Sequence, residues 1–231
     1  MSRFFLLPRR VPFTLALLLT LLAIGVLTGN LADRLSPAWY HQLGFAPRDL
    51  WTLQWRRLVT SALTTAGGDD FWLPWLAVAL VVGVTEWKFG TRWTFIAFWG
   101  LNLATLALEA LLVGLSAHLL SHPLAIAMIP VRDVGPSAGI FGLLGVLSGA
   151  LPKPWRWISG AGGLLALALI LIAPPESDTT AALAAAAGLA HLIAFPLGWT
   201  TAALGRHRRR ADRNSLPAAT EGDAHDRHDL A

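Results

Sequence analysis

The sequence predicts an all-α membrane protein whose helices cross the bilayer several times. The chain of 231 residues is 55% hydrophobic with a mean hydropathy of +0.55, and only 14% of its residues are charged. An ordinary soluble domain carries about 25% charged residues. The uncharged stretches are also long, and most approach the ~20 helical residues that cross a hydrocarbon core of ~30 Å. We therefore expect a polytopic bundle of six transmembrane helices.

Six stretches without a charged residue define the predicted helices. In chain order they are Val11–Ala32, Phe71–Thr85, Trp93–Leu108, Val134–Pro152, Trp157–Pro175 and Thr179–Gly205. The first is preceded by arginines, as a signal peptide is, but it is too long for a typical signal peptide and shows no cleavage motif near Asn30. We expect it to remain as an anchor helix. The chain contains no cysteine and hence no disulfide bond.

The predicted organisation is one membrane domain over residues 11–205. Residues 1–10 form a short cytoplasmic segment, and residues 206–231 are expected to be a disordered cytoplasmic tail because they contain almost no aliphatic side chains. Most of the 18 Lys and Arg residues then fall on the cytoplasmic side, as they do in a bacterial-type plasma (inner) membrane. The Arg-rich tail can contact anionic lipid. Nucleic acid is not an expected partner.

The first external loop, Asp33 to about Asp70, is predicted to be long and semi-polar. Within it, Trp51–Leu63 mixes aromatic residues with arginines, which is typical of a segment that lies at the membrane interface.

The fourth predicted helix is short. Pro136 and Pro152 bracket a helix from about Ser137 to Leu151, which covers ~21 Å and falls ~9 Å short of the hydrocarbon core. Lys153 holds its inner end at the cytoplasmic surface, so its outer end begins below the outer surface. Non-helical backbone at that depth lies in protein or lines a wet cavity. Ser137 is therefore expected at a sunken helix N-terminus that water reaches.

The sixth predicted helix carries His191, ten residues or ~15 Å from its outer end. His191 and Ser137 are thus expected at similar depths. Small residues allow close helix approach in lipid; they lie on both helices, at Gly139, Gly142, Gly145 and Gly149, and at Ala184, Ala187, Gly188, Ala190 and Ala194.

This pairing predicts a Ser–His dyad. An imidazole within ~3 Å of a serine hydroxyl can accept its proton as the oxygen attacks a carbonyl. The N–H of Ser137, at the positive end of a helix, can stabilise the oxyanion that develops. No acidic partner for His191 is evident. Although Gly135–Gly139 also reads as G-x-S-x-G, the soluble hydrolase elbow needs a preceding strand, which these helices exclude.

The motifs around both residues resemble those of the rhomboid intramembrane serine proteases of the six-helix type. The segment GPSAGIFGLLG from Gly135 is similar to the family's G-x-S-G motif and the I-F-G-L-L-G run that follows, and Ala190-His191 is similar to its A-H-x-x-G-x-x-x-G motif. The resemblance implies that Ser137 is the nucleophile and His191 the base. It also implies that Gly135 supports the oxyanion site and that Phe141 packs against the histidine.

Further family elements lie outside the dyad. Trp55-Arg56 resembles the W-R element of the first loop, and Glu86 with Gly90 resembles the structural E-x-x-x-G after the second helix. The family's H-x-x-x-N, which supports the oxyanion, falls on Asp70 and Pro74. Proline has no donor to offer, and losing one oxyanion donor can lower a rate by roughly 10²–10³.

These observations leave alternatives open. The resemblance implies an intramembrane serine endopeptidase that cleaves single-span membrane proteins near the outer leaflet, without a cofactor. Asp70 and Pro74 motivate the alternative, a proteolytically inactive rhomboid-like protein that binds transmembrane clients. Taken alone, Ser137 can be a helix cap and His191 a structural histidine.

Two weaker patterns stand apart from the dyad. Asn102 and Glu109 can mark an ion path of a small transporter, but an interhelical hydrogen bond and a helix-end glutamate are favoured. His118 and His122 have a metal-compatible spacing, but solvation in an external loop is favoured, and no metal site is expected.

Overall fold

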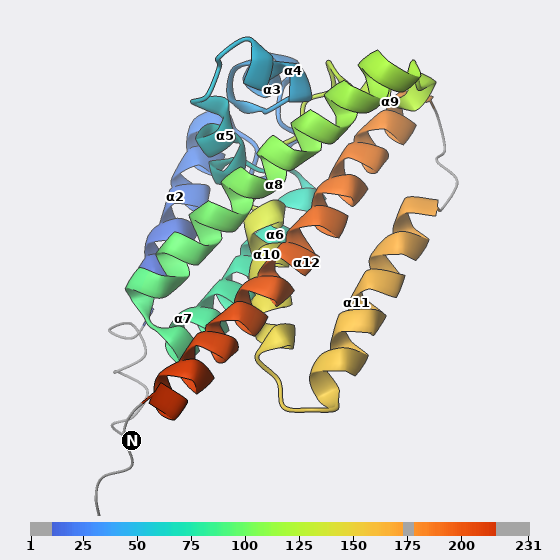
Figure 1. The fold of residues 1–231 in the computed structure, drawn as a ribbon. Helices are drawn as coiled ribbons and strands as arrows, with labels where there is room; N and C mark the ends of the chain where they lie inside the picture. Colours follow the sequence, from blue (N-terminus) through green and yellow to red (C-terminus); the bar gives the residue numbers. More distant parts are fainter. Residues whose placement is uncertain (1–10, 173–177, 216–231) are drawn as a thin grey trace, which may run out of the picture.

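The computed structural model describes residues 11–172 and 178–215, which are almost entirely helical (Figure 1). Within these two ranges no β-sheet forms, because the bridges Arg34–Gly67 and Phe45–Asp133 are isolated. The all-α class predicted from the sequence is confirmed.

The helices follow one another through short connections. Their bounds are α2 Pro12–Thr28, α3 Pro37–Leu43, α4 Pro47–Trp51, α5 Arg57–Thr60, η2 Ser61–Leu63, α6 Asp69–Ala77, η3 Val78–Val82 (a π-helix), α7 Gly83–Phe89, α8 Thr91–Leu120, α9 Pro123–Met128, α10 Ser137–Gly149, α11 Trp155–Ile172 and α12 Asp178–Ser215. The predicted first external loop thus contains the small helices α3, α4, α5 and η2.

Among the described residues, three helices are long and apolar enough to cross a membrane: Asp69–Phe89 (α6, η3 and α7 together), α8, and Ala181–Gly205 within α12. Two shorter helices, α2 and α10, are also apolar. Many large hydrophobic side chains on these helices are exposed, among them Leu19, Leu80 and Ile96. An exposed apolar surface of this kind is typical of a protein in lipid. The helices and their exposed apolar side chains thus indicate a membrane protein.

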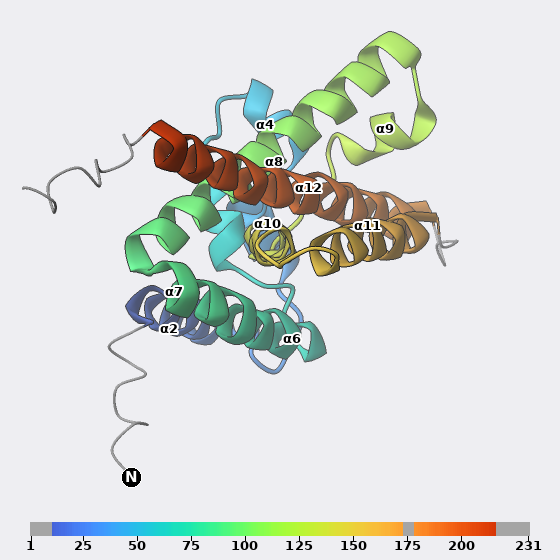
Figure 2. The same ribbon diagram turned by 60° about the horizontal axis from the view of Figure 1, so that its bottom comes forward.

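The short helix α10 lies at the centre of the bundle. Figure 2 shows it nearly end-on, with α6 and α7, α8, α12 and α11 around it. Its side chains Leu143 and Val146 are fully buried and belong to the main hydrophobic core, together with Leu21 of α2, Val82 of η3 and Phe98 of α8. Helix α10 begins at Ser137, directly after Pro136, as the sequence predicts.

Helices α10 and α12 run parallel to each other and pack with their backbones in close approach. A Cβ atom added to Gly198 would overlap the carbonyl oxygen of Gly142, and one added to Gly145 would overlap that of Phe195. Only glycine permits this distance between the helices. Of the glycines predicted to allow close packing, Gly142 and Gly145 do so, whereas Gly139 lies against Phe98 of α8. The interface fixes the register of α12 along α10.

Helix α2 is joined to α7 by Glu86. The buried carboxylate of Glu86 accepts hydrogen bonds from the backbone N–H groups of Phe13 (2.9 Å) and Thr14 (2.8 Å) and from the Thr14 hydroxyl (2.7 Å). These amides lie in the first turn of α2 and have no intrahelical acceptor. Gly90 separates α7 from α8 with φ of 86°, a conformation that favours glycine. Glu86 thus joins α7 to the start of α2, and Gly90 forms the turn between α7 and α8.

Two helices, α8 and α12, extend far beyond the C-terminal ends predicted from the sequence. Helix α8 continues past Leu108 to Leu120 because the following residues, mostly leucine and alanine, are good helix formers. Helix α12 continues past Gly205 to Ser215 through an arginine-rich stretch without proline or glycine. Residues 206–215, predicted to be disordered, are therefore helical, whereas the rest of the predicted tail and residues 1–10 lie outside the described residues.

Candidate functional site

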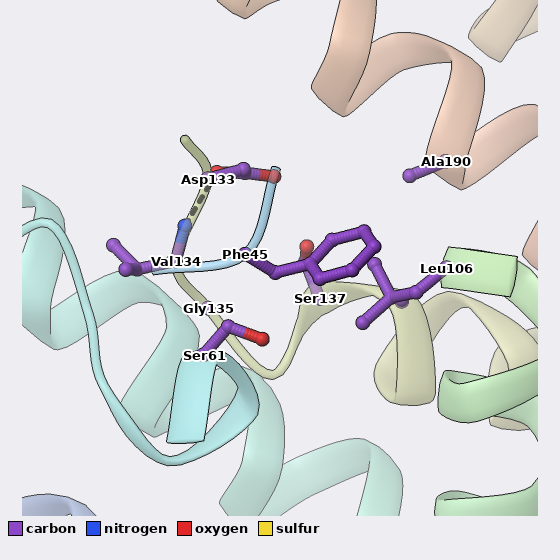
Figure 3. Close-up of a pocket in the computed structure, with 9 residues that line it drawn as sticks. Phe45, Ser61, Leu106, Asp133, Val134, Gly135, Ser137 and Ala190 are labelled. Carbon is purple, nitrogen blue, oxygen red and sulfur yellow. Dashed lines mark hydrogen bonds between the residues drawn. The ribbon is translucent and has the colours of Figure 1, made fainter. Parts of the chain in front are cut away.

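A small cavity opens beside Ser137, where the first loop, α8, the start of α10 and α12 meet. Its lining residues are Phe45, Ser61, Leu106, Asp133, Val134, Gly135, Ser137, Ala138 and Ala190. The volume of about 10 Å³ is close to the minimum that one water molecule needs. Figure 3 shows Ser61, Asp133 and Ser137 around this space, with the Phe45 side chain reaching across it toward Leu106. The cavity therefore holds two hydroxyls and one carboxyl group within mostly apolar walls.

Ser137 is the first residue of α10 and is only partly buried. The N-cap position belongs to Pro136 and not to Ser137, and the first amide of this turn with a backbone acceptor is that of Ile140, which donates to Pro136 at 3.0 Å. The N–H groups of Ser137, Ala138 and Gly139 are thus left without an intrahelical acceptor. The hydroxyl and these amides form a site at which a negatively charged oxygen would be stabilised. The reading of Ser137 as a capping residue is not supported.

His191 stacks on Phe141, one turn along α10 from Ser137. The ring centroids are 3.9 Å apart and the planes are inclined by 21°. The Nε2 atom of His191 is buried, and within the described part of the chain it has no hydrogen-bond partner. The sequence resemblance implies this contact between Phe141 and the histidine, and the structure brings the two rings together.

The preceding residue on α12, Ala190, lines the cavity next to Ser137. His191 therefore lies beside the first turns of α10, the helix that begins at Ser137. No hydrogen bond joins their side chains in this structure. Catalytic hydrogen bonds are often long in free enzymes and shorten when the substrate binds.

The segment that precedes Ser137 is held by the first loop. Asp133 and Phe45 exchange two backbone hydrogen bonds, of 3.0 and 2.8 Å, and the N–H of Gly135 donates to the carbonyl of Ser61 at 2.9 Å. Gly135 has φ of 143°, a value that a residue with a side chain adopts only with strain. Gly135 therefore turns the chain into α10, and its own amide is already occupied by Ser61.

A buried cluster of charges reinforces this connection. Arg132 donates to Asp49 at 2.6 Å and to the carbonyl of Gly44 at 2.8 Å. Arg57 also bonds the Gly44 carbonyl, at 3.3 Å, and lies 3.8 Å from Asp49. The side chains of Arg57, Arg132 and Asp49 are exposed by only 8%, 9% and 1%. Burial, followed by the charge of Arg132, lowers the pKa of Arg57 from its ordinary value, whereas Asp49 raises it.

This cluster was not predicted from the sequence. Trp55 and Arg56, the residues predicted to be structural in this loop, are both exposed, and the neighbouring Arg57 is the arginine that holds the loop. Charges in a loop follow no helical periodicity, and their partners are distant in the sequence. The only available signal was the need to pair charged residues close to an apolar bundle.

The two positions at which the sequence departs from the rhomboid pattern lie away from the cavity. Asp70 is at the start of α6, with its side chain 66% exposed and 4.0 Å from Arg34. Pro74 lies inside α6. Neither lines the cavity beside Ser137, so Asp70 does not place its charge there.

Asp133 is the one ionisable side chain among the described residues that line the cavity. One carboxylate oxygen accepts the N–H of Val134 at 2.8 Å. Burial raises the pKa of Asp133 from 3.8 to about 6, against the opposing effect of this hydrogen bond. Burial also raises the pKa of Tyr40 in α3, and the charge of Asp133 adds to the effect.

The remaining candidate residues are separate from Ser137. Glu109 lies in the middle of α8 and is 4% exposed, so the helix-end position favoured from the sequence is wrong. Asn102 makes an interhelical hydrogen bond, donating to the carbonyl of Leu58 in α5 at 3.3 Å. His118 and His122 are both exposed, and the described residues contain no cluster of three potential metal ligands.

No known protein family, curated protein or solved structure matches this chain.

Proposed function

We propose that the chain is an intramembrane serine endopeptidase in which Ser137 is the nucleophile and His191 the general base. One observation carries the proposal: the imidazole of His191 stacks on Phe141, one turn along α10 from Ser137, the residue at the N-terminus of that helix. The motif resemblance to the rhomboid proteases supports the same assignment. The six-helix arrangement, with both termini in the cytoplasm of a bacterial-type inner membrane, is part of the proposal.

The proposed reaction begins when the Ser137 hydroxyl attacks a peptide carbonyl of a single-span membrane protein. His191 accepts the hydroxyl proton and later donates it to the leaving amine. The N–H groups of Ser137 and Ala138, which have no helical acceptor, bind the oxyanion. A water molecule then hydrolyses the acyl-enzyme, again with His191 as the base. No acidic residue bonds to His191 among the described residues, which is consistent with a dyad.

A fluorophosphonate probe tests the nucleophile directly, because it reacts only with an activated serine. In detergent, the wild type should be labelled at Ser137, and Ser137→Ala and His191→Ala should not. Ser148→Ala is a matched control, since Ser148 lies on the same helix but does not line the cavity; labelling should persist there. Unlabelled wild-type protein that is folded would reject the proposal.

The second candidate is an inactive rhomboid-like protein that binds transmembrane clients. Two observations favour it: Ser137 and His191 share no hydrogen bond, and no side chain of α6 lines the cavity to support an oxyanion. This candidate predicts that single-span proteins bind with equal affinity to the wild type and to Ser137→Ala, and that neither protein reacts with the probe.

A further inference from the structure

Asp133 places an acidic group at the proposed reaction centre. It lies four residues before Ser137, in the connection between α9 and α10, and lines the same cavity. Its backbone is fixed by the two hydrogen bonds to Phe45, so its position relative to Ser137 is determined by the fold. Among the described residues, the only hydrogen bond of its carboxylate is the one that Oδ1 accepts from the N–H of Val134, so none of these residues donates to Oδ2.

No cation among the described residues pairs with the Asp133 carboxylate. The neighbouring cations, Arg132 and Arg57, are directed to Asp49 and to backbone carbonyls. In the part of the chain described here, Asp133 forms no ion pair. The groups that sense its charge are Tyr40 on α3 and the buried Glu109 on α8. Neither of these is a cation, so the ionised carboxylate has no counter-charge among the described residues. A bound cationic group can supply that counter-charge.

The size and walls of the cavity limit what that partner can be. A volume of about 10 Å³ admits a group about as large as one water molecule. An ammonium group is of that size, whereas the planar guanidinium group of arginine is larger. The Asp133 carboxylate and the Ser61 hydroxyl can accept its hydrogen bonds. The side chains of Phe45 and Leu106 offer an apolar wall for a methylene stem, and lysine is the side chain that combines such a stem with an ammonium group.

We infer that the cavity selects transmembrane clients that carry a lysine close to the peptide bond presented to Ser137. The carboxylate of Asp133 binds the ammonium group of this lysine. This substrate class rests on the proposed function, because it concerns the client bound at Ser137. Arginine is too large for the cavity and is bound less well. Glutamate is repelled by Asp133.

Equilibrium binding to the Ser137→Ala protein tests the inference without cleavage. A fluorescent single-span peptide in micelles is made with Lys, Arg, Gln or Glu at each position of its outer flank in turn. At one of these positions the Lys peptide should bind about tenfold more tightly than the Gln peptide, with Arg between them and Glu weakest. Adding Asp133→Asn should reduce the Lys–Gln difference to less than about twofold. Asp70→Asn, which removes an exposed carboxylate, is the matched control and should leave the difference intact.

A measurement at two pH values covers the case in which Asp133→Asn does not fold. The preference for Lys should be present at pH 8, where Asp133 is ionised, and lost at pH 5, where it is protonated. Equal binding of Lys and Gln peptides at pH 8, or a Lys preference that survives Asp133→Asn, would overturn the inference. Fluorophosphonate labelling separates the two proposals: a Lys preference without labelling rejects only the protease, and labelling without a Lys preference rejects only the inference.

Discussion

Phe141 and His191 lie face to face, with 3.9 Å between their ring centroids. Phe141 is one turn after Ser137, so the stack ties the orientation of the imidazole on α12 to the helix that carries the hydroxyl. The stack on Phe141 limits how the His191 imidazole can rotate toward the Ser137 hydroxyl. The contact therefore links the sequence motif around Ser137 to the one around His191.

Removal of the stack should slow the reaction of Ser137. We expect Phe141→Leu, which keeps an apolar side chain without the ring, to lower the rate of fluorophosphonate labelling about 3- to 10-fold, the worth of one aromatic contact. Phe141→Tyr should retain most of the rate because it preserves the ring. Equal rates in the wild type and Phe141→Leu would mean that the stack does not orient the base.

The glycine contact between α10 and α12 should be essential to stability. Gly198→Ala pushes a methyl group into the backbone of Gly142, and since backbone cannot rotate away, we expect a loss of about 3 kcal/mol or more. Thermal unfolding in detergent measures it. Gly162→Ala on α11 is the matched control, because nothing lies within 4 Å of the added Cβ; it should be neutral or stabilise by up to about 1 kcal/mol. Similar losses in both variants would contradict the close packing.

The buried carboxylate of Asp49 should contribute far more to stability than an exposed one. Asp49→Asn leaves Arg57 and Arg132 without their counter-charge, and breaking a buried pair typically costs about 3–5 kcal/mol. The same change at Asp70, whose pair with Arg34 is exposed, should cost less than about 0.5 kcal/mol. Unfolding in detergent compares the two variants, and a neutral Asp49→Asn would show that the cluster does not hold the loop.

The stability of the protein should depend on pH through Asp133. Its pKa is 3.8 when exposed and about 6 in the fold, so between these values the folded state binds more protons than the unfolded state. Stability therefore falls as pH rises from about 4 to about 6, by on the order of 1–3 kcal/mol. Asp133→Asn removes this dependence.

The difference between the two proteins isolates the effect of Asp133 from that of other carboxyl groups. Melting temperatures of the wild type and Asp133→Asn should converge near pH 4, and the variant should be the more stable at pH 8. A wild type that is the more stable protein at pH 8 would show that the ionised carboxylate is compensated within the fold.

Local chemistry explains why some of the structure could be predicted from the sequence. Pro136 ends the preceding segment and fixes the start of α10 at Ser137, and the glycines of α10 indicate a close helix neighbour. The length of α8 was underestimated because Glu109 was taken as the end of an apolar stretch, whereas a single buried carboxyl does not interrupt a run of helix formers.

Long-range pairing is the part that could not be predicted. Asp49 and Arg132 are 83 positions apart, and nothing in either local sequence indicates the other. The same holds for Phe45 and Asp133, whose backbones join the first loop to the segment before Ser137. A single sequence places each residue on its own element, and only the folded chain shows which elements meet.

The bond from Glu86 to the start of α2 has a consequence for assembly of the protein in the cell. Phe13 and its acceptor are separated by 73 positions, so when α2 leaves the ribosome the carboxylate that binds its first turn has not yet been made. The ribosome must synthesise the chain as far as Glu86 in α7 before these hydrogen bonds can form. Helix α2 and the α6–α7 span therefore reach their final structure together, because α2 alone lacks the hydrogen bonds from its first turn to Glu86.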